Sequence, residues 1–237
     1  MKNKHLFTLL FVLFTSSVFA QTFAPAFGGF SRKKPTYITM KDGTENTVYI
    51  KSLKFKKGLI DELKVTDSAT EKKVKLNPED IDFMYIPPSA LGKIAQKMDA
   101  MGDLSKIQDG ELSSEHLNDG YLYMESSNVQ IKKKTQYCMM QLMNPTFSGQ
   151  IKVYNDPFAK ESASVGIGGM TVAGGLDKSY YIKKKGEDVA QLIKKKDYKR
   201  DMETLFSECP AVIEKYGDNP QWSDFEKFIY DYSTMCD

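Results

Sequence analysis

The chain has 237 residues, with 33 lysine and arginine residues against 31 acidic residues. The first 20 residues hold two lysines and no acidic residue, so the remaining chain has 31 charges of each sign. This balance argues against a nucleic-acid partner, and the composition is that of an ordinary globular protein with room for one large domain or two small ones.

The first segment, residues 1–20, has the three parts of a secretory signal peptide. Lys2 and Lys4 form a basic start, an apolar run follows at 6–14, and Val18 and Ala20 are the small residues that a signal peptidase requires. We therefore expect cleavage after Ala20. The apolar run is shorter than the ~20 residues that span a bilayer, and no later segment is apolar enough, so we predict no transmembrane segment in the mature chain.

Residues 21–36 are rich in phenylalanine, alanine, glycine and proline and show no period. We interpret them as a flexible arm or tether. The alternative is that Phe23, Phe27 and Phe30 dock onto the folded part of the chain.

Residues 37–102 are predicted to form a β-meander followed by a helix. Short segments alternate between apolar and polar residues, as in an antiparallel sheet with one polar face. The Asp-Gly pair at 42–43 fits the positive φ angles of a type I′ hairpin turn, and the Lys-Gly pair at 57–58 marks a second turn. Two prolines end the meander, and Ser89 then caps a predicted helix at 89–101.

Residues 103–120 read as a polar, irregular connector, and residues 121–237 as a second sheet with C-terminal helices. Separate strands are predicted at 120–126 and 129–134, and the apolar run at 137–143 predicts a central buried strand. A further strand is expected at 150–157. The glycine-rich stretch within 156–178 is interpreted as a mobile loop, and 179–186 as the last strand.

The tail has the clearest helical periodicity of the chain. Val189, Leu192 and Ile193 suggest one short helix, and Asp197 is the expected N-cap of the next. The pattern then predicts a helix from Pro210 to Gly217.

The final helix should follow Ser223, which can form a capping box with Glu226. Such short helices must bury their apolar faces on each other or on a sheet. The predicted fold class is therefore α+β, with mostly antiparallel sheet and a C-terminal cluster of short amphipathic helices.

His116 is the one histidine of the expected mature chain, so a serine or cysteine hydrolase with a histidine base would have to use it. Ser113, Ser114, Glu115 and Asp119 lie near it in the sequence. Short polar clusters of this kind are common in loops, and we assign no catalytic residue.

Cofactor and metal motifs are also missing from the sequence. It has no His-Glu-x-x-His or Cys-x-x-Cys pair, so we predict no metal site. The glycines at 166–175 lack the lysine and serine spacing of a P-loop, so we predict no cofactor.

Cys209 and Cys236 bracket the last two predicted helices. In an oxidising compartment a disulfide between them would tie these helices together, and we predict this bond. Cys138 lies in the apolar strand at 137–143, which favours a buried free thiol.

Four segments, YCMMQLMNPTFSGQIKVYNDP, GGLDKSYYIKKKGEDVAQLIKKKDY, LFSECPAVIEKYG and WSDFEKFIYDY, resemble a group of uncharacterised exported proteins of Bacteroidota. The resemblance covers roughly the second half of the chain, and its motifs are structural rather than catalytic. It implies an exported location, periplasmic or secreted. It implies no substrate, cofactor or active site.

Charge is unevenly distributed in the second half. Residues 178–200 hold nine basic residues against three acidic ones, whereas 201–237 hold two against nine. Within the basic region, the candidate interaction surface consists of Lys183, Lys184, Lys185, Lys194, Lys195 and Lys196.

Together these features favour an exported soluble envelope protein that binds a partner and is not an enzyme. The expected partner is an envelope protein or a glycan, and a free edge of the meander could also add a partner strand. The alternative is a periplasmic hydrolase that uses carboxylates gathered from distant segments, without a local motif.

Overall fold

The computed structural model describes residues 23–89, 112–159, 164–167, 170–174 and 177–236. The expected signal peptide at 1–20 lies outside the described residues, and so does the expected helix after Ser89. The described chain contains twelve strands, four α-helices and two short 3-10 helices.

The strands of the first half are β1 (Thr36–Met40), β2 (Glu45–Lys56), β3 (Leu59–Asp67), β4 (Lys73–Leu76), β5 (Ile81–Ile86) and β6 (Leu122–Ile131). Those of the second half are β7 (Lys134–Gln141), β8 (Ile151–Asn155), β9 (Ser164–Ile167), β10 (Met170–Gly174), β11 (Ser179–Lys184) and β12 (Val189–Lys194). The helices are η1 (Pro78–Asp80), α2 (Ser114–Asn118), α3 (Lys195–Leu205), α4 (Pro210–Tyr216), η3 (Trp222–Asp224) and α5 (Phe225–Met235).

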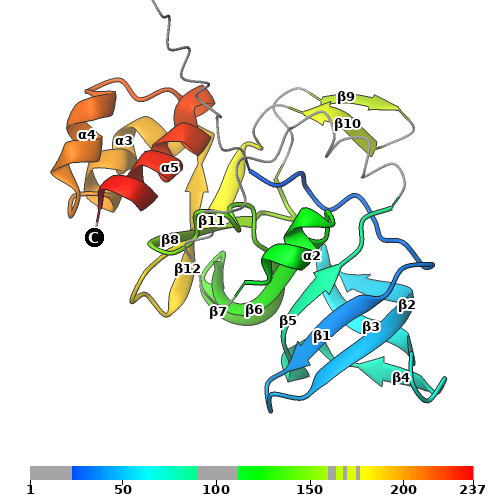
Figure 1. The fold of residues 1–237 in the computed structure, drawn as a ribbon. Coiled ribbons are helices and arrows are strands. Elements are labelled where there is room, and N and C mark those ends of the chain that lie inside the picture. The colour runs from blue at the N-terminus through cyan, green and yellow to red at the C-terminus, as the bar shows by residue number, and fades with distance from the viewer. Residues whose placement is uncertain (1–22, 90–111, 160–163, 168–169, 175–176, 237) are drawn as a thin grey trace, which may run out of the picture.

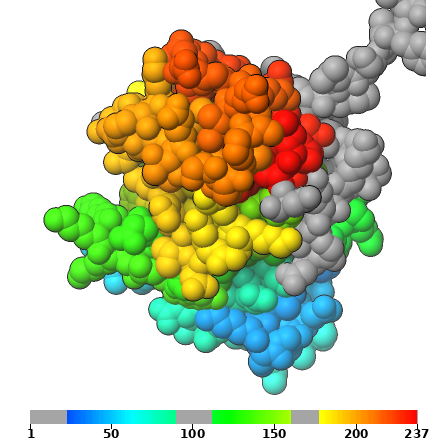
Figure 2. All heavy atoms as spheres, turned by 90° about the vertical axis from the view of Figure 1, so that its left-hand side faces the viewer, coloured from blue at the N-terminus to red at the C-terminus, as the bar shows by residue number. Residues whose placement is uncertain are grey.

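Ten of these strands form one sheet, and β9 and β10 form a separate hairpin. The order in the sheet is β4-β3-β2-β1-β5-β6-β12-β11-β8, with β7 paired to β6. Every pair is antiparallel except β6 with β12. The helices of the tail lie at the opposite end of the molecule from the meander (Figures 1 and 2). The predicted α+β fold is therefore confirmed.

Two features of strand pairing give the sheet its shape. The antiparallel pair β5–β6 places the strands of both predicted units, 37–102 and 121–237, in one sheet. Beyond β7, Leu142 forms a bridge with Tyr154 of β8, and the Met143 N–H donates to the Val153 carbonyl at 2.7 Å. Because β6, β12, β11 and β8 are paired in turn, this bridge closes a ring of five strands.

The two hairpin turns of the meander differ in conformation. Lys57 and Gly58 both have positive φ angles, 51° and 78°, as a type I′ turn requires. The type I′ prediction at 42–43 was wrong, because Gly43 has a positive φ but Asp42 does not. Instead, the Asp42 carboxylate accepts the Thr44 N–H at 2.9 Å and stabilises the turn from its side chain.

The segment from residue 23 to 36 is docked along the molecule and is not a loose tether. Phe23 is 6% exposed and contacts the rings of Phe147, Tyr180 and Phe225 in the core of the helical end. Its neighbour, Ala24, donates its N–H to the Met143 carbonyl at 2.6 Å.

Further along this segment, Gln141 makes two hydrogen bonds that fix it on β7. The Phe27 N–H donates to Oε1 of Gln141, and Nε2 donates to the Pro25 carbonyl, both at 2.8 Å. Phe27 and Phe30 then pack against the core of the meander. The segment therefore links the helical end to the meander, as the docking alternative expects.

Several strands of the second half differ from their predictions. Strand β6 is continuous where two short strands were expected, since its ladder with β7 runs unbroken from Met124 to Ile131. The run at 137–143 is buried apart from Tyr137, but β7 is not a fully paired central strand: it has a ladder only with β6 and, on its other side, the single Leu142–Tyr154 bridge to β8. The stretch 156–178 contains the β9–β10 hairpin, and the polar connector ends in helix α2.

The predicted helix at Val189, Leu192 and Ile193 is wrong, because these residues belong to β12. The segment VAQLIK fits both a helical face and an alternating strand. It pairs with β11 on one side and with β6 on the other, and these backbone hydrogen bonds decide in favour of the strand.

Aromatic side chains fill the space between the tail helices and the face of β8, β11 and β12 that they cover. Phe225 is fully buried, and its ring lies 4.6 Å from that of Trp222 and 5.6 Å from that of Tyr180. The Trp222 indole N–H donates to the Asp177 carbonyl at 2.8 Å. The predicted cluster of short amphipathic helices is thus held on the sheet by its aromatic faces.

Two predicted helix starts need correction. Helix α3 begins directly after β12 with Lys194 as its N-cap, so Asp197 lies in the first turn. Helix α5 follows η3 without a side-chain cap, so the predicted capping box of Ser223 and Glu226 does not form. Ser223 lies instead inside the 3-10 turn Trp222–Asp224, whose Trp222 side chain is buried.

Helix α4 has the ends that the sequence predicts. Pro210 occupies its first turn, where no N–H is needed, and Gly217 ends it with a φ of 63°.

Candidate functional site

The six lysines of the candidate interaction surface fall into two groups. Strands β11 and β12 form a hairpin in which Ser179 lies opposite Lys194. The group Lys194–Lys196 is therefore at the open end of the hairpin, whereas Lys183–Lys185 is at its turn. The two groups are separated by about five residues of strand, roughly 16 Å, and do not form one patch.

Lys183 points into the five-strand ring. Its Nζ donates to Oγ of Ser127 at 2.9 Å, and Ser127 is 2% exposed. Burial lowers the pKa of Lys183, the charge of Glu125 partly offsets this, and Lys152 lowers the pKa further. Lys183 is therefore part of a buried polar cluster rather than of a solvent-facing surface.

Glu125 is the centre of this cluster and is 8% exposed. It accepts a hydrogen bond from the Tyr154 hydroxyl and another from the Tyr123 hydroxyl at 3.3 Å, and it pairs with Nζ of Lys152 at 2.9 Å. Sequence reasoning missed this arrangement, because its members come from strands 27 to 56 residues apart. With three donors on one buried carboxylate, the cluster supports the sheet and offers no free acid.

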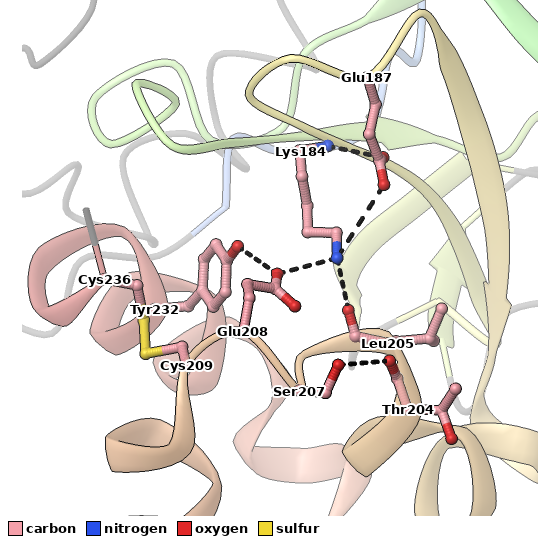
Figure 3. A network of polar contacts seen from close by, with 9 residues as sticks. All are labelled: Lys184, Glu187, Thr204, Leu205, Ser207, Glu208, Cys209, Tyr232 and Cys236. Carbon is pink, nitrogen blue, oxygen red and sulfur yellow. Dashed lines mark hydrogen bonds and ion pairs between the residues drawn. A yellow bond between two sulfur atoms is a disulfide. The ribbon is translucent and has the colours of Figure 1, made fainter.

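Lys184 lies at the centre of a second network, which joins β11 to the tail helices (Figure 3). Its Nζ donates to the Leu205 carbonyl at 2.7 Å and to Oε1 of Glu208 at 2.8 Å. The same Glu208 oxygen accepts the Tyr232 hydroxyl at 2.6 Å. Glu187 completes the network by accepting the backbone N–H of Lys184 at 3.0 Å.

The network perturbs the ionisation of its members. Burial opposes ionisation of Glu208, but hydrogen bonds from Lys184 and Tyr232 outweigh it and lower the pKa of Glu208 below its ordinary value. Burial and the hydrogen bond to Glu208 together raise the pKa of the Tyr232 hydroxyl. Glu208 is thus a permanent anion near neutral pH, as a structural ion pair requires.

Because the pKa of Glu208 is lowered in the folded protein, its contribution to stability is present above the unfolded-state pKa and is lost as pH falls. We expect Glu208→Gln to destabilise the protein at neutral pH. The difference from the original protein should shrink between roughly pH 5 and pH 3. Urea unfolding at several pH values measures this. The control Glu203→Gln removes one exposed charge from α3 without touching the network. A stability difference between Glu208→Gln and the unmutated protein that stays constant with pH would contradict the lowered pKa of Glu208.

The predicted disulfide is present beside this network. Cys209 and Cys236 are bonded, with 5.7 Å between their Cα atoms, and the bond joins the start of α4 to the end of α5 (Figure 3). Cys138 is free and buried, and burial raises the pKa of its thiol to about 11. It therefore stays protonated and unreactive near neutral pH.

A hollow of ≈ 210 Å³ lies beside the Lys184 network. It is lined by Ile182, Lys184, Glu187, Gln191, Thr204 and Leu205. The two ionisable side chains in this lining already contact each other, with 3.9 Å between Nζ and Oε1. The acid in this lining is therefore paired with a lysine, which does not favour a role for the hollow as a hydrolase site.

His116 lies in α2 and is enclosed by aromatic rings. Its imidazole stacks on Tyr37, with 4.1 Å between ring centroids, and lies 4.8 Å from Tyr85. Oγ of Ser113 accepts the backbone N–H of His116 at 3.4 Å, which makes Ser113 the N-cap of this helix. These contacts are those of a packed helix start and do not form a serine–histidine pair.

Of the six predicted lysines, Lys185 is exposed at the β11–β12 turn, and the other three exposed ones lie where β12 passes into α3. Lys178, Lys194, Lys195 and Lys196 are all exposed, and the Lys195 N–H donates to the Lys178 carbonyl at 2.9 Å. Within the described residues, none of the four forms an ion pair. We call these four residues the α3 lysine surface. Lys178 is an addition to the predicted set, and its proximity to Lys194 could not be known before β12 was seen to be a strand.

Neither a metal cluster nor a bilayer-spanning helix is found in the described parts of the chain. Groups of three or more histidine, cysteine or acidic side chains placed to hold a metal ion are absent there. No helix among these residues is long and apolar enough to cross a membrane. Comparison of the chain with family models, with curated proteins and with solved structures found no match.

Proposed function

We propose that this chain is an exported, non-enzymatic binding protein that holds an acidic polymer of the cell envelope on its α3 lysine surface. The observation that carries the proposal is the group of four exposed lysines, none of which forms an ion pair within the described residues. Rows of carboxylate or phosphate groups on a partner are the chemistry that complements such a surface.

The position of these lysines costs stability, which supports a role outside folding. Lys195 and Lys196 occupy the first turn of α3, where the helix dipole disfavours cations by roughly 0.3–1 kcal/mol each. Lys194 is the N-cap and makes no side-chain capping bond, whereas a serine or aspartate there would add about 1 kcal/mol. A sequence optimised only for a stable helix would place acids here.

Export is supported by two independent features. The first 20 residues have the pattern of a secretory signal, and cleavage there would leave a chain with balanced charge. The Cys209–Cys236 disulfide fits an oxidising compartment such as the periplasm or the cell exterior.

The hydrolase alternative gains little support from the described carboxylates. Glu125 is buried and holds three hydrogen-bond donors, and Glu208 is tied to Lys184 and Tyr232. Neither is free to accept a proton from water in an open pocket.

Charge reversal at the α3 lysine surface tests the proposal. We expect K194E/K195E/K196E to weaken binding to poly-L-glutamate and to an acidic polysaccharide by roughly ten- to a hundredfold, since exposed charge contacts are worth about 0.5–1 kcal/mol each. Isothermal titration at low salt measures the affinity, and salt should weaken it. The two polymers distinguish a protein-like from a glycan partner. Because acids suit the start of a helix, the variant should fold at least as stably as the original.

The matched control is K132E/K133E/K134E, which reverses three exposed lysines, two in the β6–β7 turn and one at the start of β7. It changes net charge equally but leaves the four lysines of the α3 lysine surface in place. Equal losses in both variants would mean that binding follows net charge alone and would overturn the proposal. Variants at Lys183 or Lys184 are unsuitable for this binding test, because these residues hold the two polar networks together and their loss would change stability.

A further inference from the structure

Strand β4 leaves a free edge at one end of the sheet, and it shares no residue with the α3 lysine surface. Strand β4 pairs with β3 and ends the sheet, and among the described residues its outer edge has no partner strand. It lies at the far end of the molecule from α3 (Figure 1).

The phase of the ladder shows which backbone groups face outward. The Asp67 N–H donates to the Lys72 carbonyl at 2.9 Å, so this pair is hydrogen-bonded. Hydrogen-bonded and non-hydrogen-bonded pairs alternate along an antiparallel ladder. The backbone of Val74 is therefore hydrogen-bonded to that of Val65, whereas the neighbouring pairs on either side, which contain Lys73 and Lys75, are not hydrogen-bonded. The N–H and C=O groups of Lys73 and Lys75 therefore point away from the sheet.

The apolar face at this edge is incomplete. Val65 is 1% exposed, whereas Val74, its partner on the same face of the sheet, is 41% exposed. Leu76 is only partly buried against the same core. One further strand would supply the missing neighbour of Val74, as β4 does for Val65.

The opposite face of β4 is basic. Lys73 and Lys75 project there, and Lys75 lies opposite Lys64 of β3. Glu62 approaches Lys75 at 3.5 Å, but Lys73 and Lys64 form no ion pair in the described chain. Like charges on opposing strands destabilise a ladder, so the Lys64–Lys75 pair leaves this face short of negative charge even with Glu62 beside Lys75.

We propose that β4 accepts an extended segment of another protein in which acidic and apolar residues alternate. The segment adds a strand by pairing with the backbone of Lys73 and Lys75. Its acidic side chains lie beside these lysines, and an apolar side chain between them covers Val74. A second copy of the chain is disfavoured, because two antiparallel β4 edges centred on Val74 would place Lys73 opposite Lys75.

The test uses a capped Ser-Glu-Val-Glu-Val-Glu-Ser peptide and the same peptide with lysine in place of glutamate. Hydrogen exchange read by NMR should show the amides of Lys73 and Lys75 slowed by roughly tenfold with the acidic peptide, while Val74 is already slow without it. The lysine peptide should leave all three unchanged. Unchanged exchange at Lys73 and Lys75 with saturating acidic peptide would overturn the proposal.

Variants separate strand pairing from simple charge attraction. Lys75→Pro removes an outward N–H that the native ladder does not use, so the fold should survive and peptide binding should be lost. Lys75→Thr keeps that N–H and should retain most of the binding; equal loss in both variants contradicts strand addition. Should Lys75→Pro fail to fold, K73E/K75E keeps the backbone, and it should prefer the lysine peptide. A negative result at β4 would not count against the proposed role of the α3 lysine surface, since the two sites share no residue.

Discussion

Replacing Cys209 and Cys236 together by serine is expected to lower the free energy of unfolding by about 3–4 kcal/mol. The two cysteines are 27 residues apart, and the bond between them limits the unfolded chain to a closed loop. Without the bond, the unfolded state gains the entropy of that loop, while α4 and α5 keep their other contacts, such as the Tyr216–Asp231 hydrogen bond at 2.6 Å. The effect is thus one on stability and not on the fold.

Urea unfolding followed by circular dichroism measures this loss, and reductant provides the control. Adding a reducing agent should bring the original protein to the stability of the double variant and should leave the variant unchanged. A double variant as stable as the oxidised protein would show that the α4–α5 packing suffices without the bond. Further destabilisation of the variant by reductant would point to a different cause, because Cys138 forms no disulfide.

Glu125→Gln is expected to lower the free energy of unfolding by about 3 kcal/mol, since breaking a buried ion pair leaves an uncompensated charge. Glutamine keeps the shape of the side chain but removes the negative charge next to Lys152. It also leaves Lys152 and Lys183 near each other without an acid between them. The control is Lys54→Met, which breaks the exposed pair with Asp61 and should change the free energy of unfolding little, because solvent screens that pair.

The pH dependence of this variant provides a second readout. The pKa of Lys183 is lowered in the folded protein, so at alkaline pH the unfolded state binds more protons and stability rises with pH. Removal of Glu125 takes away the charge that holds the Lys183 pKa up, so Glu125→Gln should recover part of its loss as pH rises toward roughly pH 10. A loss that does not change with pH would mean that the lysines are not the source of the destabilisation.

The meander could be predicted from the sequence because its signals are local. Alternating side chains and glycine-containing turns at 42–43 and 57–58 specify strands within a few residues of one another. The disulfide could also be predicted, since the chain has just three cysteines and two of them bracket a pair of helices. The α+β class follows from these features together.

The sequence-based predictions that were wrong or incomplete concern residues whose structure depends on partners far away in the chain. VAQLIK has apolar residues at both helical and strand spacing, and it becomes β12 because β6 and β11 pair with it from both sides. Phe23 lacks any local period, and its burial depends on rings from three remote segments. Of the six lysines in the candidate surface, Lys183 and Lys184 are engaged by Ser127 and Glu208, which no spacing in the sequence reveals.

The most direct test of the proposed function locates bound polyanion on the protein. The original chain is treated with a limiting amount of an acetylating reagent, with and without poly-L-glutamate, and lysine modification is read by mass spectrometry. We predict protection at Lys178, Lys194, Lys195 and Lys196, with no change at residues 132–134. Equal protection at both places, or none at the α3 lysine surface, would contradict the account.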